Sequence, residues 1–201
     1  MLRFLAPAAL AAALVLLLTA ACDEAEEELL NATLTPAATE TPTPEPTSTP
    51  AATVNYTDPT YGYSFDYPAT WYAFPEKRAA GSVTLYSYDP ANTQGVGPVP
   101  RDKLKVFFWV AEGVDKPLEQ WLEEGKNSPG QITPPTVLSQ SGITIAGKQG
   151  LVETTEHDGV SSTSYYIPIG GNRVFVVNAG PADSQVWPQF ETVLSSIRFA
   201  P

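Results

Sequence analysis

Cysteine and histidine are almost missing from this sequence, since each occurs once among 201 residues. A structural zinc site takes about four such ligands, and a disulfide takes a pair of cysteines. The scarcity therefore excludes zinc fingers, catalytic cysteine–histidine pairs and disulfide-stabilised scaffolds.

Basic side chains are scarce as well. Acidic residues outnumber lysine and arginine by 22 to 11, which gives a formal net charge of −11. A protein that binds nucleic acid needs a basic surface to neutralise the phosphates. The balance therefore excludes DNA and RNA as partners.

The N-terminus carries the clearest positive signal in the sequence. Arg3 is the only charged residue before Asp23, and residues 5–18 are almost entirely alanine, leucine and valine. A short positive region followed by an apolar region and small residues is typical of a secretory signal peptide. Residues 18–22, Leu-Thr-Ala-Ala-Cys, resemble the lipobox of bacterial lipoproteins. The resemblance implies cleavage before Cys22 and attachment of a diacylglyceryl group to its thiol.

Two other interpretations of this segment remain open. The first is an uncleaved signal anchor, because residues 4–21 are close to the lower limit of about 17 residues for a membrane-spanning helix, although Pro7 interrupts them. The second interpretation is an ordinary secretory signal peptide, in which the cysteine is not acylated. A lipoprotein is favoured because the single cysteine lies where acylation requires it. We predict a signal peptide over residues 1–21, and a protein anchored by lipid in the cell membrane with its domain on the extracytoplasmic side.

The next segment, residues 22–53, has a different composition. From residue 23 to residue 53 there are seven acidic residues, no lysine or arginine and no aromatic residue, and residues 41–50 read Thr-Pro-Thr-Pro-Glu-Pro-Thr-Ser-Thr-Pro. Such a segment cannot bury enough apolar surface to offset the entropy of ordering it. Proline also favours the extended polyproline II conformation. We predict an acidic and then Thr/Pro-rich disordered linker over residues 22–53.

The remaining residues, 54–201, have the composition of a globular domain. They contain all four tryptophans, all nine tyrosines and seven of the eight phenylalanines. Residues 61–67 alternate aromatic with small or polar side chains, which predicts a half-buried strand. Residues 82–88 predict a second strand. Residues 103–111 are apolar on both faces, which predicts a central strand that is covered on both sides.

The second half of the domain predicts a three-stranded antiparallel meander. Residues 151–155 and 162–169 form a hairpin through the turn residues Asp158-Gly159, and a further turn leads to a strand over residues 173–179. Apolar residues at helical spacing predict one helix over residues 116–124. They predict a second helix near the C-terminus, capped by Asp183 or Ser184. Strands with few, separated helices indicate an α+β fold.

Both ends of this domain resemble PsbP-like domains. Residues 61–71, Tyr-Gly-Tyr-Ser-Phe-Asp-Tyr-Pro-Ala-Thr-Trp, are similar to the entry of such domains, and residues 193–199 are similar to their terminal helix and exit. The resemblance implies an antiparallel sheet with helices on both faces, an α-β-α sandwich. Well-known members of the family are extrinsic subunits of photosystem II, and bacterial relatives include secreted lipoproteins. No functional residue is carried over, because no binding motif matches position by position.

One acidic cluster surrounds the single histidine. Glu153, Glu156, His157 and Asp158 offer oxygen and nitrogen ligands that a cation could use. They also flank a strand end and a tight turn, so their side chains need not converge. A solvated hairpin tip is the favoured interpretation, and we predict no metal site and no catalytic residue.

Aromatic residues at alternating strand positions are the other candidates for a site. An exposed aromatic patch is a typical binding surface, whereas the favoured alternative is that most of these rings fill the core. The residues concerned are Tyr86, Tyr88, Phe107, Trp109, Tyr165 and Tyr166.

The functional prediction follows from the anchor, the linker and the missing catalytic set. We predict a membrane-anchored envelope lipoprotein that presents a non-catalytic PsbP-like domain for binding or assembly, without a cofactor. Its partners are the membrane, through the lipid, and an envelope protein, a membrane complex or a small ligand. The alternative is a hydrolase or metal-dependent envelope enzyme that uses the region Glu153–Asp158.

Overall fold

The computed structural model of the chain describes residues 52–77, 79–92, 98–126 and 134–200. The predicted signal peptide, Cys22 and all but the last two residues of the predicted linker lie outside the described residues. Residues 52–200 are therefore considered by themselves.

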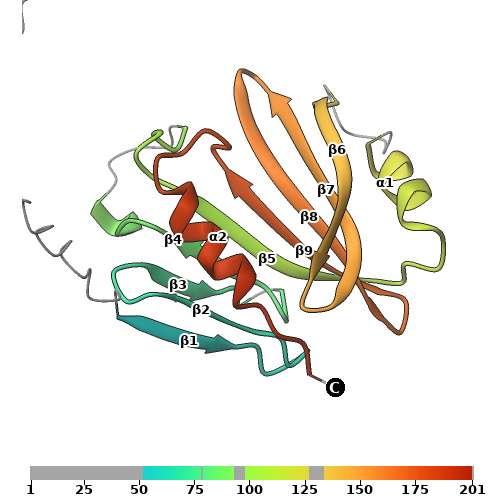
Figure 1. The fold of residues 1–201 in the computed structure, drawn as a ribbon, viewed down its shortest axis with the longest axis horizontal. Helices are drawn as coiled ribbons and strands as arrows, with labels where there is room; N and C mark the ends of the chain where they lie inside the picture. The colour runs from blue at the N-terminus through green and yellow to red at the C-terminus, as the bar shows by residue number, and fades with distance from the viewer. Residues whose placement is uncertain (1–51, 78, 93–97, 127–133, 201) are drawn as a thin grey trace, which may run out of the picture. The chain divides into compact units, whose positions relative to one another are not determined.

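Nine β-strands, two α-helices and a short 3-10 helix form within these ranges (Figure 1). In chain order the elements are β1 (Thr53–Thr57), β2 (Ser64–Pro68), β3 (Tyr72–Pro75), β4 (Val83–Tyr86), η1 (Pro90–Asn92), β5 (Lys105–Glu112), α1 (Leu118–Lys126), β6 (Thr136–Ile145), β7 (Lys148–His157), β8 (Val160–Gly170), β9 (Arg173–Gly180) and α2 (Trp187–Ser195).

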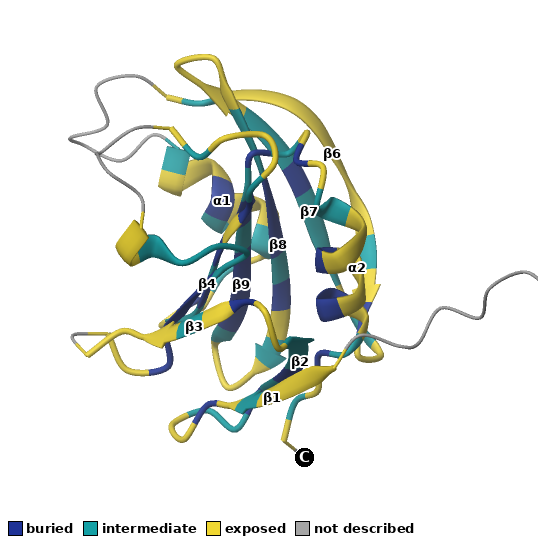
Figure 2. Cartoon of the chain, turned by 90° about the vertical axis from the view of Figure 1, so that its left-hand side faces the viewer, coloured by how far each residue is buried: buried dark blue, intermediate teal, exposed yellow. Residues whose placement is uncertain are grey.

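Seven of the strands form one antiparallel sheet in the order β3-β4-β5-β9-β8-β7-β6, and β1 and β2 pair separately. The run from β7 to β9 is the predicted meander, and the hairpin from β6 extends it by one strand. Helices α1 and α2 lie on opposite sides of the sheet (Figure 2). The fold is therefore the α+β arrangement that the sequence predicts, with helices on both faces.

The main core lies on the α2 side of the sheet, where β1 and β2 also pack. Phe65 of β2 stacks on Phe108 of β5 at 4.4 Å between ring centroids, and both side chains are fully buried. Trp71 follows the Pro68 turn, is 5% exposed, and donates its indole N–H to Gln189 of α2 at 3.2 Å. The resemblance to PsbP-like domains therefore rests on residues that build the core.

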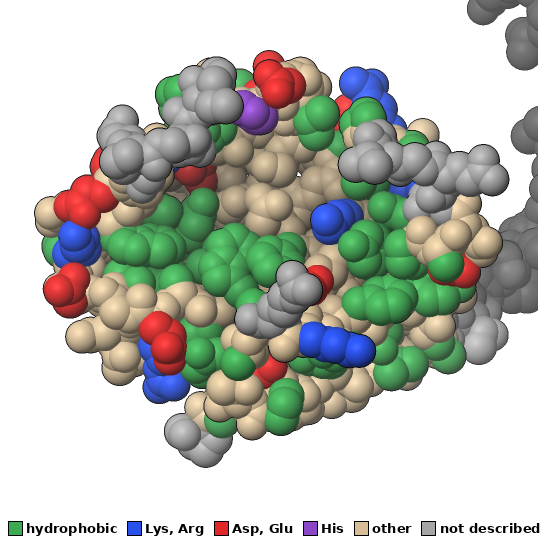
Figure 3. All heavy atoms as spheres, turned by 180° about the vertical axis from the view of Figure 1, so that it is seen from behind, with side chains coloured by type: hydrophobic (Ala, Val, Ile, Leu, Met, Phe, Trp, Pro, Cys, Tyr) green, Lys and Arg blue, Asp and Glu red, His purple; other side chains and the backbone are tan. Residues whose placement is uncertain are grey.

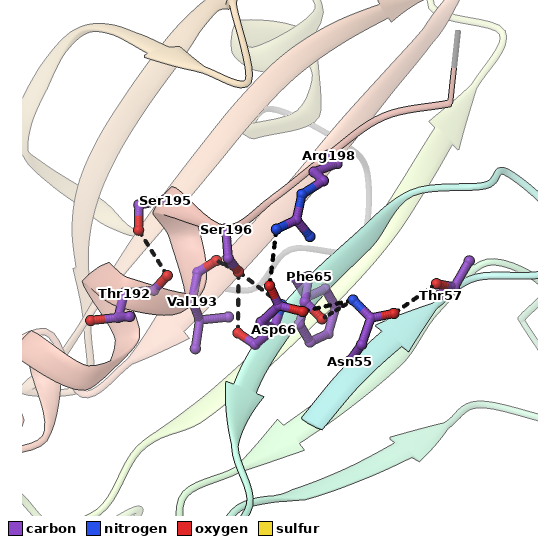
Figure 4. A network of polar contacts seen from close by, with 9 residues as sticks. All are labelled: Asn55, Thr57, Phe65, Asp66, Thr192, Val193, Ser195, Ser196 and Arg198. Atoms are coloured by element: carbon purple, nitrogen blue, oxygen red, sulfur yellow. Dashed lines mark hydrogen bonds and ion pairs between the residues drawn. The ribbon is translucent and has the colours of Figure 1, made fainter. Parts of the chain in front are cut away.

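A network of polar contacts attaches the C-terminal segment to β2 (Figure 4). Ser64 and Arg198 exchange two backbone hydrogen bonds of 2.9 Å, and the Ser196 hydroxyl accepts the backbone N–H of Asp66 at 2.8 Å. The Asp66 carboxylate accepts hydrogen bonds from Asn55 at 2.8 Å and Arg198 at 3.0 Å. These bonds hold the pKa of Asp66 below its ordinary value, with Asn55 contributing most.

Several element boundaries differ from the prediction. Helix α1 begins at Leu118, two residues later than expected, and continues through Gly125. The N-cap of α2 is Val186 rather than Asp183 or Ser184. The Ser184 hydroxyl instead donates to the carbonyl of Lys103 at 2.8 Å, so it joins the segment before α2 to the start of β5.

Candidate functional site

The face of the seven-stranded sheet opposite α2, which we call the open face, collects aromatic side chains from three neighbouring strands. Strand register pairs Tyr72 with Tyr86 and Thr84 with Phe107, so these positions share a face. Side chains alternate along a strand, which brings every second residue of β3, β4 and β5 to the open face. The aromatic belt consists of Tyr72, Phe74, Tyr86, Phe107 and Trp109, together with Tyr88, which follows β4 and contacts the ring of Tyr86.

The rings of the belt contact one another along and across the strands. Phe107 and Trp109 stack at 5.0 Å with an interplanar angle of 25°. Tyr86 meets Phe74 at 5.8 Å and Tyr88 at 5.4 Å, both edge to face. Aromatic pairs in these arrangements are favourable beyond the area that they bury. The belt is therefore an ordered surface of rings.

Two lysines lie on the same face as the belt. Lys103 Nζ lies 5.1 Å from the ring centroid of Tyr88, and Lys105 Nζ lies 5.7 Å from that of Tyr86. Neither lysine forms an ion pair with another described residue. The ring faces attract the ammonium groups, and burial raises the pKa of the Tyr88 hydroxyl.

No helix covers the β3–β4 end of the belt within the described residues, and the exposed fraction is 40% for Tyr72 and 45% for Phe74. Figure 3 shows this side of the molecule, where hydrophobic side chains gather in a band that crosses the sheet. The prediction that the strand over residues 103–111 is covered on both sides is wrong in this respect, because Phe107 and Trp109 are only half-buried. Contiguous exposed apolar surface of this kind marks interaction sites.

Helix α1 covers the other end of the belt. Its Leu118 and Trp121 pack on a small buried cluster of Val114, Val174 and Val176, which Trp109 also contacts. At the end of the helix, Lys126 Nζ donates to the Glu153 carboxylate at 2.7 Å, and Glu153 is 2% exposed. The ion pair fixes the C-terminal end of α1 against β7.

Polar side chains replace aromatic ones farther along the open face. Asn178 of β9 pairs in register with both Phe107 and Ser164. Its amide donates to Ser164 at 2.8 Å and more weakly to Ser162 at 3.4 Å. We call Asn178, Ser162, Ser164 and Thr155, which lie on the same face, the polar floor.

The acidic residues around His157 do not converge. Glu153 is buried and paired with Lys126, whereas Glu156 points to the opposite face of β7 by the alternation of the strand. His157 and Asp158 are exposed at the hairpin tip, with 3.4 Å between Nε2 and the carboxylate. Within the described ranges, no group of three or more acidic, histidine or cysteine side chains is arranged to hold a metal ion.

A groove of about 370 Å³ lies on the other face of the sheet, between α2 and the β6–β7 hairpin. Its walls are mostly apolar, with Ile145 and Leu194 among them, and its polar groups include Tyr165 and Glu191. Burial, and after it the charge of Glu191, raises the pKa of Tyr165 to about 12. The Tyr165 hydroxyl therefore gives up its proton less readily than an ordinary tyrosine does.

The sequence identified part of the belt and missed the rest. Among the six predicted aromatic candidates, Tyr165 fills the core, while Tyr166 packs beside α1. Tyr72 and Phe74 were missed because β3 has four residues and ends at a proline. Lys103 and Lys105 begin the alternation that Phe107 and Trp109 continue, and this pattern is the signal that could have found the two lysines.

No family model matches the sequence, and no curated protein shows significant similarity to it. Solved structures do share its fold. Cyanobacterial PsbP from Synechocystis sp. PCC 6803 is similar at 16% identity and a TM-score of 0.50, over 76% of this chain and 95% of that one. The described domain therefore has a PsbP-like fold, as its two ends indicate.

Two further solved structures are similar at lower TM-scores. One is a protein of Bacteroides thetaiotaomicron, at 18% identity and a TM-score of 0.39, over 69% of this chain and 45% of that one. The other is LpqN of Mycobacterium tuberculosis, which is involved in cell envelope biogenesis, at 18% identity and a TM-score of 0.45, over 75% and 91%. Neither helix of the described ranges is long and apolar enough to cross a membrane.

Proposed function

We propose that the chain is a lipid-anchored protein of the cell envelope whose PsbP-like domain is a non-catalytic binding module. The open face of the seven-stranded sheet is its binding surface. Cys22 carries the lipid, and the linker of residues 22–53 holds the domain on the extracytoplasmic side of the membrane.

The observation that supports this function best is the aromatic belt with its two lysines. Tyrosine, tryptophan and phenylalanine dominate the energetics of binding surfaces because they bury large areas at low entropic cost. Tyr72 and Phe74 lie on β3, the edge strand of the sheet. Because their side chains are exposed on the open face, they do not form part of the core on the other face. A binding role accounts for apolar surface that folding alone does not require.

A non-catalytic role accords with the positions of the ionisable groups. A catalytic acid or base must lie within hydrogen-bond reach of the proton that it transfers, in a site shared with the other groups that act on the substrate. Glu153 forms an ion pair under α1, and His157 and Asp158 lie exposed at the tip of the β7–β8 hairpin. The alternative enzyme using residues 153–158 would need these groups to move together.

The anchor is argued from the sequence. Each buried methylene of an acyl chain contributes about 0.8 kcal/mol, and stable anchoring takes two signals such as two acyl chains. A diacylglyceryl group on Cys22 supplies both chains at one residue.

Photo-crosslinking from the open face tests the binding role directly. A photoreactive phenylalanine analogue at position 74, in cells that produce the protein, is expected to capture an envelope component. The matched control carries the same analogue at Val54 of β1, which is 42% exposed against 45% for Phe74 and lies in the other sheet.

The position dependence of the adduct is the readout. Adducts from position 74 that are absent from position 54, and that disappear when Phe107→Ala or Lys105→Glu is added, support the proposal. Equal adducts from both positions, or adducts that persist in both double variants, contradict it.

A further inference from the structure

The groove between α2 and the β6–β7 hairpin, which we call the α2 groove, lies on the opposite face of the sheet from the aromatic belt. Helix α2 crosses the sheet on this side (Figure 1). The volume of the groove, about 370 Å³, is near the lower end of the range for ligand pockets, about 300 to 1,000 Å³. Ile143, Ile145 and Leu194 give it apolar walls. The α2 groove therefore suits a small ligand with an apolar body.

Tyr165 places a polar atom among these apolar walls. The residue is 6% exposed, and its ring packs edge to face on Phe190 at 6.1 Å between centroids. Its hydroxyl forms no hydrogen bond with another described residue. Every completely buried side-chain oxygen or nitrogen of the described residues does have a partner, so this hydroxyl is not completely buried. Because Tyr165 lines the α2 groove, we infer that its hydroxyl reaches the groove and is available to a ligand there.

Glu191 carries the only charge among the described residues that line the groove. It forms no ion pair with another described residue. Its charge raises the pKa of Tyr165, yet no hydrogen bond joins the two side chains. Lys148, which pairs in register with Ile145, lies over the ring of Phe199 at 5.9 Å rather than against Glu191. The groove therefore offers an unpaired carboxylate near an unpartnered hydroxyl.

A primary ammonium group complements these two oxygen groups. It has three N–H donors and no acceptor, so it can donate both to the carboxylate of Glu191 and to the hydroxyl oxygen of Tyr165. A ligand with a carboxylate or phosphate group would meet a like charge at Glu191. A metal ion would need more oxygen ligands than these, and the described residues contain no group of three acidic, histidine or cysteine side chains that could hold one.

We propose that the α2 groove binds a small primary amine with an apolar body. The ammonium group bonds to Glu191 and Tyr165, and the apolar body packs against Ile143, Ile145 and Leu194. This site goes beyond the proposed function, because it lies on the other face of the sheet from the proposed binding surface and does not depend on it.

A titration with three six-carbon compounds that differ in their head group tests the proposal. Hexylamine, hexanol and hexanoate are added at neutral pH to the chain of residues 23–201, which contains every described residue. The methyl resonances of Ile143, Ile145 and Leu194 are followed by nuclear magnetic resonance. Hexylamine is expected to cause saturable shifts with a dissociation constant about threefold or more below that of hexanol, and hexanoate is expected to cause none. The Trp109 indole on the open face is expected to stay unchanged.

Two variants assign the contacts of the head group. Tyr165→Phe removes only the hydroxyl and is expected to weaken hexylamine binding about three- to tenfold. Glu191→Gln removes only the charge and is expected to weaken it about two- to fivefold, without changing the binding of hexanol.

Glu119→Gln is the matched control. It removes an exposed acidic side chain of α1, on the other side of the sheet, and is expected to leave hexylamine binding unchanged. Urea unfolding of each variant confirms that it is folded.

Three results overturn the proposal. They are the absence of saturable shifts with hexylamine, equally tight binding of hexanol or hexanoate, and unchanged hexylamine binding in either Tyr165→Phe or Glu191→Gln. None of these results bears on the crosslink from position 74, so the binding role of the open face and the amine site fail separately.

Discussion

The buried carboxylate of Glu153 accepts a hydrogen bond from Lys126 at 2.7 Å, and this ion pair joins the last turn of α1 to β7. Burial by itself lowers the pKa of Lys126, but its hydrogen bonds to Glu153 and Glu123 outweigh burial and raise it. The pair borders the polar floor, because Glu153 lies next to Ser164 in register. The position of α1 on the open face therefore depends on one polar contact as well as on the cluster around Val176.

Lys126→Met is expected to destabilise the domain by about 2 to 4 kcal/mol, because it leaves the Glu153 carboxylate buried without a partner. Urea unfolding measures the change. Lys116→Met is the control, since its pair with Glu124 is exposed to solvent and is expected to contribute little to stability. An equal decrease in the free energy of unfolding in the two variants would show that the Lys126–Glu153 ion pair stabilises the domain no more than an exposed pair does.

Phe65→Ala is expected to cost about 3 to 5 kcal/mol, because it opens a cavity between β2 and Phe108 at the centre of the core. Phe74→Ala makes the same chemical change on the open face and is expected to cost at most about 1 kcal/mol. Thermal or urea unfolding of both variants checks the difference. A large loss for Phe74→Ala would mean that the belt serves stability rather than binding.

Asp66 is expected to titrate below the ordinary aspartate value of about 3.9. A lowered folded-state pKa contributes stability that is present above the unfolded pKa and is lost as the pH falls through the folded one. Carboxyl carbon resonances report the pKa directly. Asn55→Ala and Arg198→Ala are each expected to raise it, because each removes a hydrogen bond that the carboxylate accepts. An unchanged pKa in both variants would contradict the contacts of Figure 4.

Cys22→Ser is expected to leave the protein unprocessed and to remove its acylation, because the thiol is the acceptor of the lipid. Metabolic labelling with a fatty acid and gel mobility measure both effects. A variant that keeps its labelling, processed size and membrane partitioning would show that the cysteine is incidental.

The sequence was most informative where side-chain periodicity decides structure. The meander of β7 to β9 follows from alternation and from the Asp158-Gly159 turn, and Asp158 and Gly159 both adopt positive φ. Strand β6 was mostly missed because residues 136–142 are all exposed and show no apolar alternation. Its position at the sheet edge depends on pairing with β7, which no local pattern encodes.

The candidate site was harder to predict than the fold. Alternation shows that Phe107 and Phe108 point to opposite faces, but it does not say which face a helix will cover. That choice depends on where α1 and α2 pack, and α1 reaches only the Trp109 end of the belt. The polar floor was not predicted, because Ser162, Ser164 and Asn178 come together only through the register of β8 and β9.

Lysine footprinting in the native envelope tests the central claim, that the open face is a binding surface, most directly. Lys105 lies over the ring of Tyr86 at 5.7 Å on the open face, and Lys148 lies over Phe199 at 5.9 Å as a matched control. Acetylation with a membrane-permeant reagent is compared between intact cells and the purified protein. The account predicts that Lys103 and Lys105 are protected in cells while Lys148 reacts equally in both. Equal labelling of all three lysines in the two conditions would contradict it.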